Sequence, residues 1–257
     1  MSRLHPLRRL HGWVRDAPDR HDYHYSEIRR APTRLPPKVD LRCLCPPVAD
    51  QGDCNCCSGN ALAAALEFLE LKDGLPFTYL SRLFIYYNAR AIEDSVKSDT
   101  GVMPRDAVKA VAKQGVCAER SWPYFVTKVR LKPSAAAYRE ALRHKITSYH
   151  RLDTIEELRA CLAEGYPFVF GFTTYESFES DRVAKTGNLP MPRKGEKQGY
   201  GHNAVGVGYD EAQQRFIVMN SYGPEWGARG YFTIPYDYLA DNKLAGDFWT
   251  IRRGKGM

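Results

Sequence analysis

The apolar residues of this chain change their spacing near its midpoint, and this change constrains the fold more than any other feature. Between residues 57 and 114 they recur every three or four positions, which is typical of amphipathic helices. From residue 168 onward they form short β-branched and aromatic runs bounded by glycine, proline and aspartate, which is typical of strands. We therefore expect an α+β protein with a helical first half and a mainly antiparallel β second half.

Local signals set the bounds of these elements. The predicted helices span residues 57–72, 79–92, 104–114 and 154–162, and the predicted strands span residues 168–172, 204–209, 215–220, 230–234 and 248–251. The first helix stops at Asp73 and Gly74, and the third opens with Pro104 and closes at Gly115. Residues 176–201 are polar and contain lysine and glycine, so we expect a long loop there.

Length and composition exclude several classes of protein. The chain has 257 residues, 44% of them hydrophobic, which suffices for one large domain or two closely packed halves. Its net charge of +7 is spread along the sequence, so we expect no nucleic-acid partner. No stretch approaches 18 consecutive apolar residues, so we expect no membrane association. No signal peptide is visible, so we expect a location that is cytoplasmic or reached by an export route not visible in the sequence. The oligomeric state is not indicated.

Cysteines are concentrated near the start of the first predicted helix. Five of the seven lie between residues 43 and 57, and because seven is odd, at least one thiol has no partner within the chain. Cys57 would stand in the first helical turn, where unpaired N–H groups and the positive end of the helix dipole favour a thiolate. A thiolate nucleophile also needs an imidazole to exchange the proton and a third group to orient that imidazole.

One histidine has a setting that suits this task. His202 stands at the entry to an apolar strand, behind glycines that allow another chain to approach closely. Asn220 ends the next apolar run, from which its amide oxygen could reach an imidazole on a paired strand. No spacing of Cys and His fits a zinc site better than it fits this pair, so we expect no metal and no organic cofactor.

Three motifs in this order along the chain resemble those of the papain-like cysteine peptidases. They are residues 51–57, with the pattern Gln-Gly-x-Cys-x-x-Cys, the strand at residues 202–209, and the Gly- and aromatic-rich turn at residues 220–231. Weaker similarities occur at residues 37–42, 100–103 and 122–124, and together they cover residues 33–251. The resemblance implies a two-subdomain fold, with an active-site cleft between a helical left half and an antiparallel β right half.

The resemblance also implies a role for each motif residue in peptide hydrolysis through a thioester. Cys57 would be the nucleophile, His202 its acid/base partner and Asn220 the orienting amide. The side chain of Gln51 and the backbone N–H of Cys57 would form the oxyanion hole. The residues implied to contact a peptide or protein substrate are Gly101, Met103, Asn203 and Tyr222, with residues 245–247 beside them.

The sequence departs from the family pattern at a few positions. Ser58 and Tyr222 each stand where the family usually has tryptophan, and we expect Tyr222 to shield the hydrogen bond between His202 and Asn220. Cys54 matches a family half-cystine whose usual partner position, near Ser98, holds no cysteine. Cys54 or Cys56 could therefore pair with Cys43 or Cys45, or all of these thiols could be free.

Residues 1–36 lack a clear period, so we expect an irregular extension in front of a peptidase domain at residues 37–257. We expect residues 13–25 to lie across or beside the cleft and restrict access, as a short pro-like segment would. The alternative is a segment packed elsewhere on the surface. Two alternatives to a peptidase also stay open: a catalytically silent module that binds peptides or proteins, and a hydrolase of side-chain amides or isopeptides.

Overall fold

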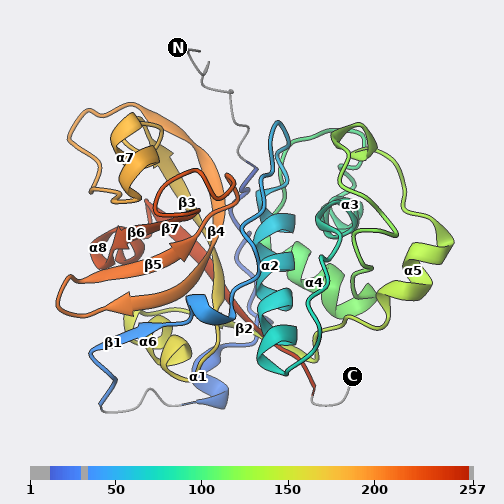
Figure 1. Ribbon diagram of the computed structural model, residues 1–257, viewed down its shortest axis with the longest axis horizontal. Helices are drawn as coiled ribbons and strands as arrows, with labels where there is room; N and C mark the ends of the chain where they lie inside the picture. Colours follow the sequence, from blue (N-terminus) through green and yellow to red (C-terminus); the bar gives the residue numbers. More distant parts are fainter. Residues whose placement is uncertain (1–11, 30–33, 255–257) are drawn as a thin grey trace.

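The chain folds into two halves that pack side by side, one made of helices and one built on a β-sheet (Figure 1). The computed structural model describes residues 12–29 and 34–254. The helical half is formed by the first part of the chain, and the sheet half by the second part together with β1 (Lys38–Asp40). The predicted α+β class and the predicted order of the two halves are confirmed.

The helices lie close to the predicted positions. Their bounds are α1 Tyr25–Ile28, α2 Cys57–Lys72, α3 Arg82–Ile92, α4 Pro104–Gln114, α5 Ala135–Ala141, α6 Ile155–Ala163, α7 Asp181–Thr186 and α8 Tyr236–Ala240, with short 3-10 turns at Arg42–Leu44 and Val126–Lys128. Helices α2 and α4 match their predicted bounds. Helix α3 begins three residues later than predicted, because the side chain of Ser81 accepts a hydrogen bond from Phe84 N and caps the helix there.

The strands form one antiparallel sheet within the described part of the chain. Their bounds are β1 Lys38–Asp40, β2 Ser148–Leu152, β3 Phe168–Tyr175, β4 Gln198–Asp210, β5 Arg215–Met219, β6 Tyr231–Pro235 and β7 Ala245–Arg252. The order across the sheet is β2-β7-β3-β4-β5-β6, with β1 also paired to β4. All five predicted strands are present. The prediction of a loop over residues 176–201 is wrong, because α7 and the first residues of β4 lie within it.

Helix α2 stands between the two halves and is buried at nearly all of its sixteen residues. It packs against α3 and α4 on one side and against β4 on the other. A helix that is buried all round is apolar on most of its surface, which accounts for the run of alanine and leucine in its sequence. Its first residue, Cys57, therefore faces the junction between the halves.

Aromatic side chains fill the sheet half around the middle of β3. The Phe172 ring is fully buried and lies 5.3 Å from the Phe178 ring and 5.7 Å from the Phe232 ring, centroid to centroid. Its backbone is paired with His202 on β4, and the two rings meet edge to face at 5.6 Å. This cluster fixes the strand that carries His202.

We expect the substitution Phe172→Ala to lower the free energy of unfolding by about 3–5 kcal/mol, because it removes the ring at the centre of a packed cluster and leaves a cavity. Urea denaturation monitored by circular dichroism measures this. The control is Leu142→Ala at a side chain that is 58% exposed, which should change stability by less than about 0.5 kcal/mol. Equal effects of the two substitutions would show that the aromatic cluster does not stabilise the sheet half.

Candidate active site

The predicted nucleophile Cys57 is the first residue of helix α2 and is fully buried. No side chain caps this helix, since Cys56 at the N-cap makes no side-chain cap hydrogen bond. The N–H groups of the first turn and the positive end of the helix dipole therefore lie close to the Cys57 sulfur, an environment that stabilises a thiolate.

His202 on β4 and Asn220, the residue directly after the neighbouring strand β5, come together as predicted. The distance between His202 Nε2 and Asn220 Oδ1 is 2.8 Å. Asn220 Oδ1 also accepts a hydrogen bond from Ser221 N, so this atom is an oxygen and His202 Nε2 carries the proton that it donates. The other ring nitrogen, Nδ1, is therefore the basic one in neutral His202.

The Tyr222 ring covers this histidine–asparagine pair. Its centroid lies 5.0 Å from that of the His202 ring, and the buried Phe178 ring lies 6.0 Å from the imidazole. Both His202 and Asn220 are buried, so water has little access to their hydrogen bond. Tyr222 thus lies where the sequence predicted an aromatic shield for this hydrogen bond.

The packing of α2 against β4 brings the Cys57 sulfur next to the residue that follows His202. Asn203 donates its side-chain N–H to Cys57 Sγ at 3.7 Å and to Ser58 Oγ at 2.9 Å. Ser58 Oγ in turn reaches the Val102 carbonyl at 3.4 Å. The space that Ser58 leaves, where the family has tryptophan, is thus occupied by polar groups that join both halves.

Gln51 is buried and is held by hydrogen bonds from its backbone and its side chain. Its side-chain Nε2 donates to Cys54 O at 2.9 Å, and its Oε1 accepts from Ser221 Oγ at 2.6 Å. Its backbone N–H donates to Ser221 O at 2.9 Å. Ser221, which the sequence analysis did not single out, is therefore a direct support of Gln51, and its position after Asn220 in the same motif was the available signal.

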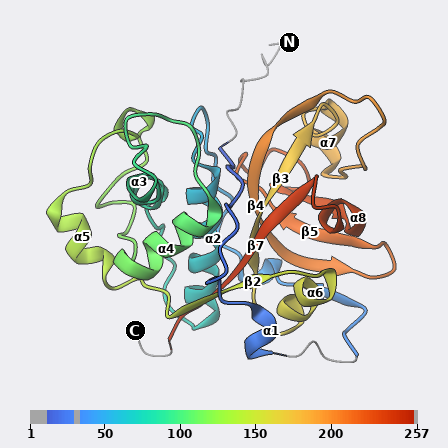
Figure 2. The same cartoon turned by 180° about the vertical axis from the view of Figure 1, so that it is seen from behind.

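The N-terminal strap, defined as residues 12–22, runs between the helical half and the sheet half (Figure 2). Trp13 N donates to Gly201 O at 3.2 Å on the sheet side. On the helical side, Val14 N donates to Val102 O at 3.2 Å, and Val102 N donates to Gly12 O at 2.9 Å. The strap thus bonds to both sides of the site through its backbone.

Glycines allow the strap to approach this closely. A Cβ atom on Gly12 would lie 1.7 Å from Asn55 O, and one on Gly101 would lie 2.1 Å from Gly12 O. Cβ atoms on Gly171 and Gly201 would collide with Trp13. The glycines before His202 therefore do admit a second stretch of chain, and that stretch is the protein's own N-terminal strap.

Charged and aromatic side chains anchor the strap beside the site. Trp13 Nε1 and Asp16 N each donate to Asp247 Oδ2 at 2.9 Å. The Asp16 carboxylate accepts from Trp249 Nε1 at 2.9 Å and from Arg105 N at 3.1 Å. Further along, Arg105 pairs with Asp22 at 2.7 Å, and both side chains are buried.

The strap changes the chemical environment of Cys57. Burial raises the pKa of the Cys57 thiol, and hydrogen bonds from the backbone of Gly12 and from Asn203 offset part of this effect. A thiol with a raised pKa is a weak nucleophile. The Cys57 sulfur is therefore covered in this arrangement, and burial outweighs the groups that favour its thiolate.

The other residues predicted to contact substrate are distributed around the strap and the Cys57 sulfur. Gly101 lies against Gly12, and Asn203 contacts Cys57. Met103 is the residue before α4 and is half-buried, with its backbone N–H donating to Glu93. Of residues 245–247, Asp247 points to Trp13 and has an unusual left-handed backbone with φ 54°.

All seven cysteines lie in the described ranges, and every one of them is a free thiol. Of the alternatives left open by the sequence, the structure therefore has the one without a disulfide among Cys43, Cys45, Cys54 and Cys56. Cys54 and Cys56 are both buried beside the loop that holds Gln51.

Residues 12–29 and 34–254 show neither a metal-binding cluster nor a membrane-spanning helix. No three or more His, Cys, Asp and Glu side chains gather as they would around a metal ion. No helix in these ranges combines the length and the apolar character needed to cross a bilayer.

Comparison with known proteins places this geometry in a family. Residues 35–245 match the model of the papain family of cysteine proteases. An uncharacterized peptidase C1-like protein of Acanthamoeba polyphaga mimivirus is 44% identical over 213 residues, which cover 79% of this chain and 68% of that protein. Cysteine proteinase 3 of Entamoeba histolytica is 27% identical over 86% of this chain and 68% of its own length.

Among solved structures, xylellain, a cysteine protease from Xylella fastidiosa, superposes with a TM-score of 0.88 at 40% identity, covering 96% of this chain and 98% of that one. A digestive procathepsin L 3 of Tenebrio molitor shares the fold at 19% identity, with a TM-score of 0.69 over 96% of this chain and 76% of that one. The chain therefore belongs to the papain family and is a cysteine endopeptidase that acts on peptides or proteins.

Proposed function

We propose that four residues carry out the peptidase reaction of this chain: Cys57, His202, Asn220 and Gln51. The observation that carries the proposal is the 2.8 Å bond between His202 Nε2 and Asn220 Oδ1. The residue after His202 on β4, Asn203, bonds to the Cys57 sulfur and so brings this pair next to the nucleophile. This bond leaves Nδ1 of His202 as the ring nitrogen that exchanges the proton with Cys57.

The reaction then proceeds in two steps. The Cys57 thiolate attacks the peptide carbonyl carbon, and the His202 imidazolium gives its proton to the leaving amine as the thioester forms. In the second step, His202 takes a proton from water, the hydroxide attacks the thioester carbonyl, and the carboxylic acid leaves while the thiolate is restored. Asn220 keeps the imidazole in one orientation and one tautomer through both steps.

Gln51 supplies one of the two donors for the oxyanion. Its Nε2 group carries two protons; one is donated to Cys54 O, and we assign the negative oxygen of the tetrahedral intermediate to the same amide group once substrate is bound. The other donor is the backbone N–H of Cys57 at the start of α2. Both donors are held in place before the charge appears, which is the condition for effective stabilisation of a transition state.

We further propose that the N-terminal extension, residues 1–36, keeps the peptidase domain at residues 37–257 in a latent form. Support comes from the strap, whose backbone bonds to Val102 and Gly201 on the two sides of the site. A substrate peptide cannot reach the buried Cys57 sulfur until these bonds break. Activation therefore requires the strap to leave, either by displacement or by cleavage.

Replacing Cys57 by alanine should abolish both peptide hydrolysis and labelling by an epoxide-type thiol inhibitor. Gln51→Ala should lower kcat by about 10²–10³, because one oxyanion donor is lost. The matched control is Cys43→Ala at an exposed thiol, which should leave the rate of hydrolysis unchanged. Hydrolysis that persists in the Cys57→Ala protein would refute the assignment of the nucleophile.

Gly12→Ala should release the strap, because the new Cβ would stand 1.7 Å from the backbone oxygen of Asn55. We expect the rate of peptide hydrolysis and the rate of Cys57 alkylation by iodoacetamide both to rise at least about tenfold. Gly195→Ala is the control: its left-handed backbone, with φ 79°, makes it strained as well, but its Cβ would meet no other atom within 4 Å and so cannot clash with the strap. Unchanged rates in the Gly12→Ala protein would contradict a latent form.

We expect a larger fraction of the protein to be latent as the pH falls. Burial and the charge of Asp247 raise the pKa of Asp16 to about 6 in the bound strap, although hydrogen bonds from Trp249 and Arg105 act in the opposite direction. The released strap has an ordinary carboxyl group, so the bound form takes up the proton more readily and is favoured as pH falls through 6.

The measurement is the ratio of wild-type to Gly12→Ala hydrolysis rates, in which the pH dependence of catalysis itself cancels. This ratio should increase several-fold between about pH 5 and pH 7.5, and it should vary much less when both proteins carry Asp16→Asn. A ratio that decreases with rising pH would show that other groups control release of the strap.

A further inference from the structure

Gln51 has a support in the helical half that the mechanism above does not use. Tyr124, in the segment after α4, donates its hydroxyl proton to the backbone oxygen of Gln51 at 2.7 Å. The sheet half holds the same residue through Ser221, which bonds to both its backbone N–H and its side-chain Oε1. Gln51 is thus held from both halves of the molecule.

The hydrogen bonds around the Tyr124 hydroxyl have a single consistent direction. Its one proton goes to Gln51 O, which can only accept, so the 2.9 Å contact with Cys56 Sγ requires the Cys56 thiol to donate. Asn60 then donates to Cys56 Sγ at 3.3 Å and to Cys56 O at 3.0 Å. The chain of donors runs from Asn60 through Cys56 and Tyr124 to Gln51.

Arg82 holds the Tyr124 ring in place. Its guanidinium carbon lies 3.8 Å from the ring centroid, and its side chain is only 12% exposed. Two hydrogen bonds to the Glu119 carboxylate, at 3.0 and 3.1 Å, fix the guanidinium plane. The ring therefore has one preferred orientation, and its hydroxyl points at Gln51.

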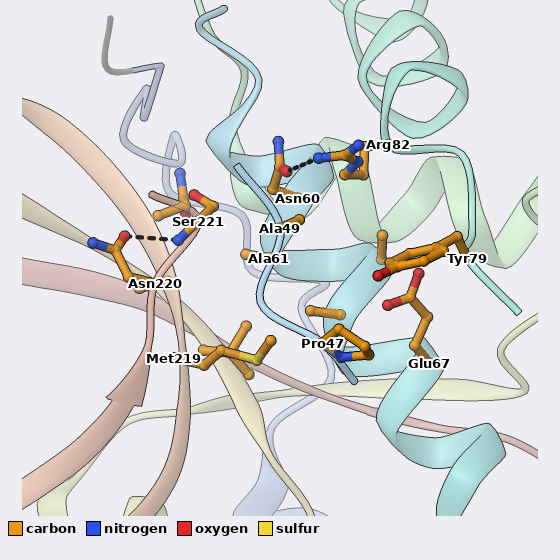
Figure 3. A pocket seen from close by; sticks show the side chains of 15 residues that line it. Pro47, Ala49, Asn60, Ala61, Glu67, Tyr79, Arg82, Met219, Asn220 and Ser221 are labelled. Atoms are coloured by element: carbon orange, nitrogen blue, oxygen red, sulfur yellow. Dashed lines mark hydrogen bonds between the residues drawn. The ribbon is translucent and has the colours of Figure 1, made fainter. Parts of the chain in front are cut away.

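The same guanidinium reaches the two chain segments that carry the oxyanion donors. Arg82 Nη1 donates to Asn60 Oδ1 on α2 at 3.1 Å and to the carbonyl of Asp50, the residue before Gln51, at 3.2 Å. Figure 3 shows Arg82 bonded to Asn60 at one side of a small cavity, with Ser221 and Asn220 at the other. The loop before Cys57 is thus enclosed by a polar network.

We propose that Tyr124, oriented by Arg82, is a positioning residue for the oxyanion hole. By fixing the peptide plane of Gln51, its hydroxyl aims the Gln51 side chain at the site where negative charge develops. The inference rests on the proposed role of Gln51. Because the Tyr124 hydroxyl bonds to the Gln51 backbone, its effect should fall on stabilisation of the oxyanion and not on the nucleophile.

The test is Tyr124→Phe, which keeps the ring on Arg82 and removes only the hydroxyl. Both parent and variant are the full chain carrying Gly12→Ala, so that the strap does not limit the rate. We expect kcat for a peptide substrate to fall about tenfold, with KM changed less than twofold, since a displaced donor is a milder loss than a deleted one. The rate of Cys57 alkylation by iodoacetamide, which forms no oxyanion, should change less than twofold.

The matched control is Tyr138→Phe, which removes a similar partly buried hydroxyl that bonds to Asn88 Oδ1 at 2.7 Å and not to Gln51. It should leave kcat unchanged. In the Gln51→Ala background, Tyr124→Phe should lower kcat by less than about twofold, because the side chain through which it acts is absent. A purely structural role would instead lower kcat equally in both backgrounds and slow alkylation.

Three results would overturn the inference: an unchanged kcat in Tyr124→Phe, an equal fall in Tyr138→Phe, or a full tenfold fall that persists without the Gln51 side chain. These results differ from a failure of the proposed function. If the parent did not hydrolyse the peptide, or if Gln51→Ala alone had no effect on kcat, the role of Gln51 would be wrong and this inference would fall with it.

Discussion

The packing of helix α2 against strand β4 is the interaction on which the site depends. It brings the first turn of a buried helix to the strand that carries His202, and Asn203 joins the two by bonding to both Cys57 and Ser58. The imidazole is fixed on the sheet half by Asn220 and the aromatic cluster, whereas the sulfur belongs to α2. Neither half holds both of the proposed reacting groups, so the relative position of the halves sets the distance between them.

The same junction accounts for the N-terminal strap. A place where two halves meet around glycines offers free backbone groups on both sides, and the backbone around Trp13 meets them with three hydrogen bonds to Val102 and Gly201. Asp247 receives Trp13 and Asp16 from the strap while also pairing with Arg151. We propose that catalysis and latency draw on one set of groups, for which the strap competes with a substrate peptide.

The loop that carries Gln51 depends on both halves as well. Ser221 supports it from the sheet, and Tyr124 supports it from the helical half through a ring stacked on Arg82. Charged and polar groups in such a buried network bond to one another in a fixed arrangement, which suits a site that must stabilise charge without rearranging. We infer that the oxyanion hole is complete only when the two halves are packed.

The sequence alone determined the elements whose signals are local. Apolar periodicity predicted α2, Pro104 and Gly115 marked the ends of α4, and the motifs pointed to Cys57, His202 and Asn220. Short or half-polar elements such as β1, β2 and α7 escaped prediction, because three to six residues carry too little periodicity. Only the tertiary structure decided that Trp13 meets Asp247 and that Tyr124 meets Gln51. Contacts between residues far apart in the chain depend on how whole elements pack, and no local pattern in the sequence records that packing.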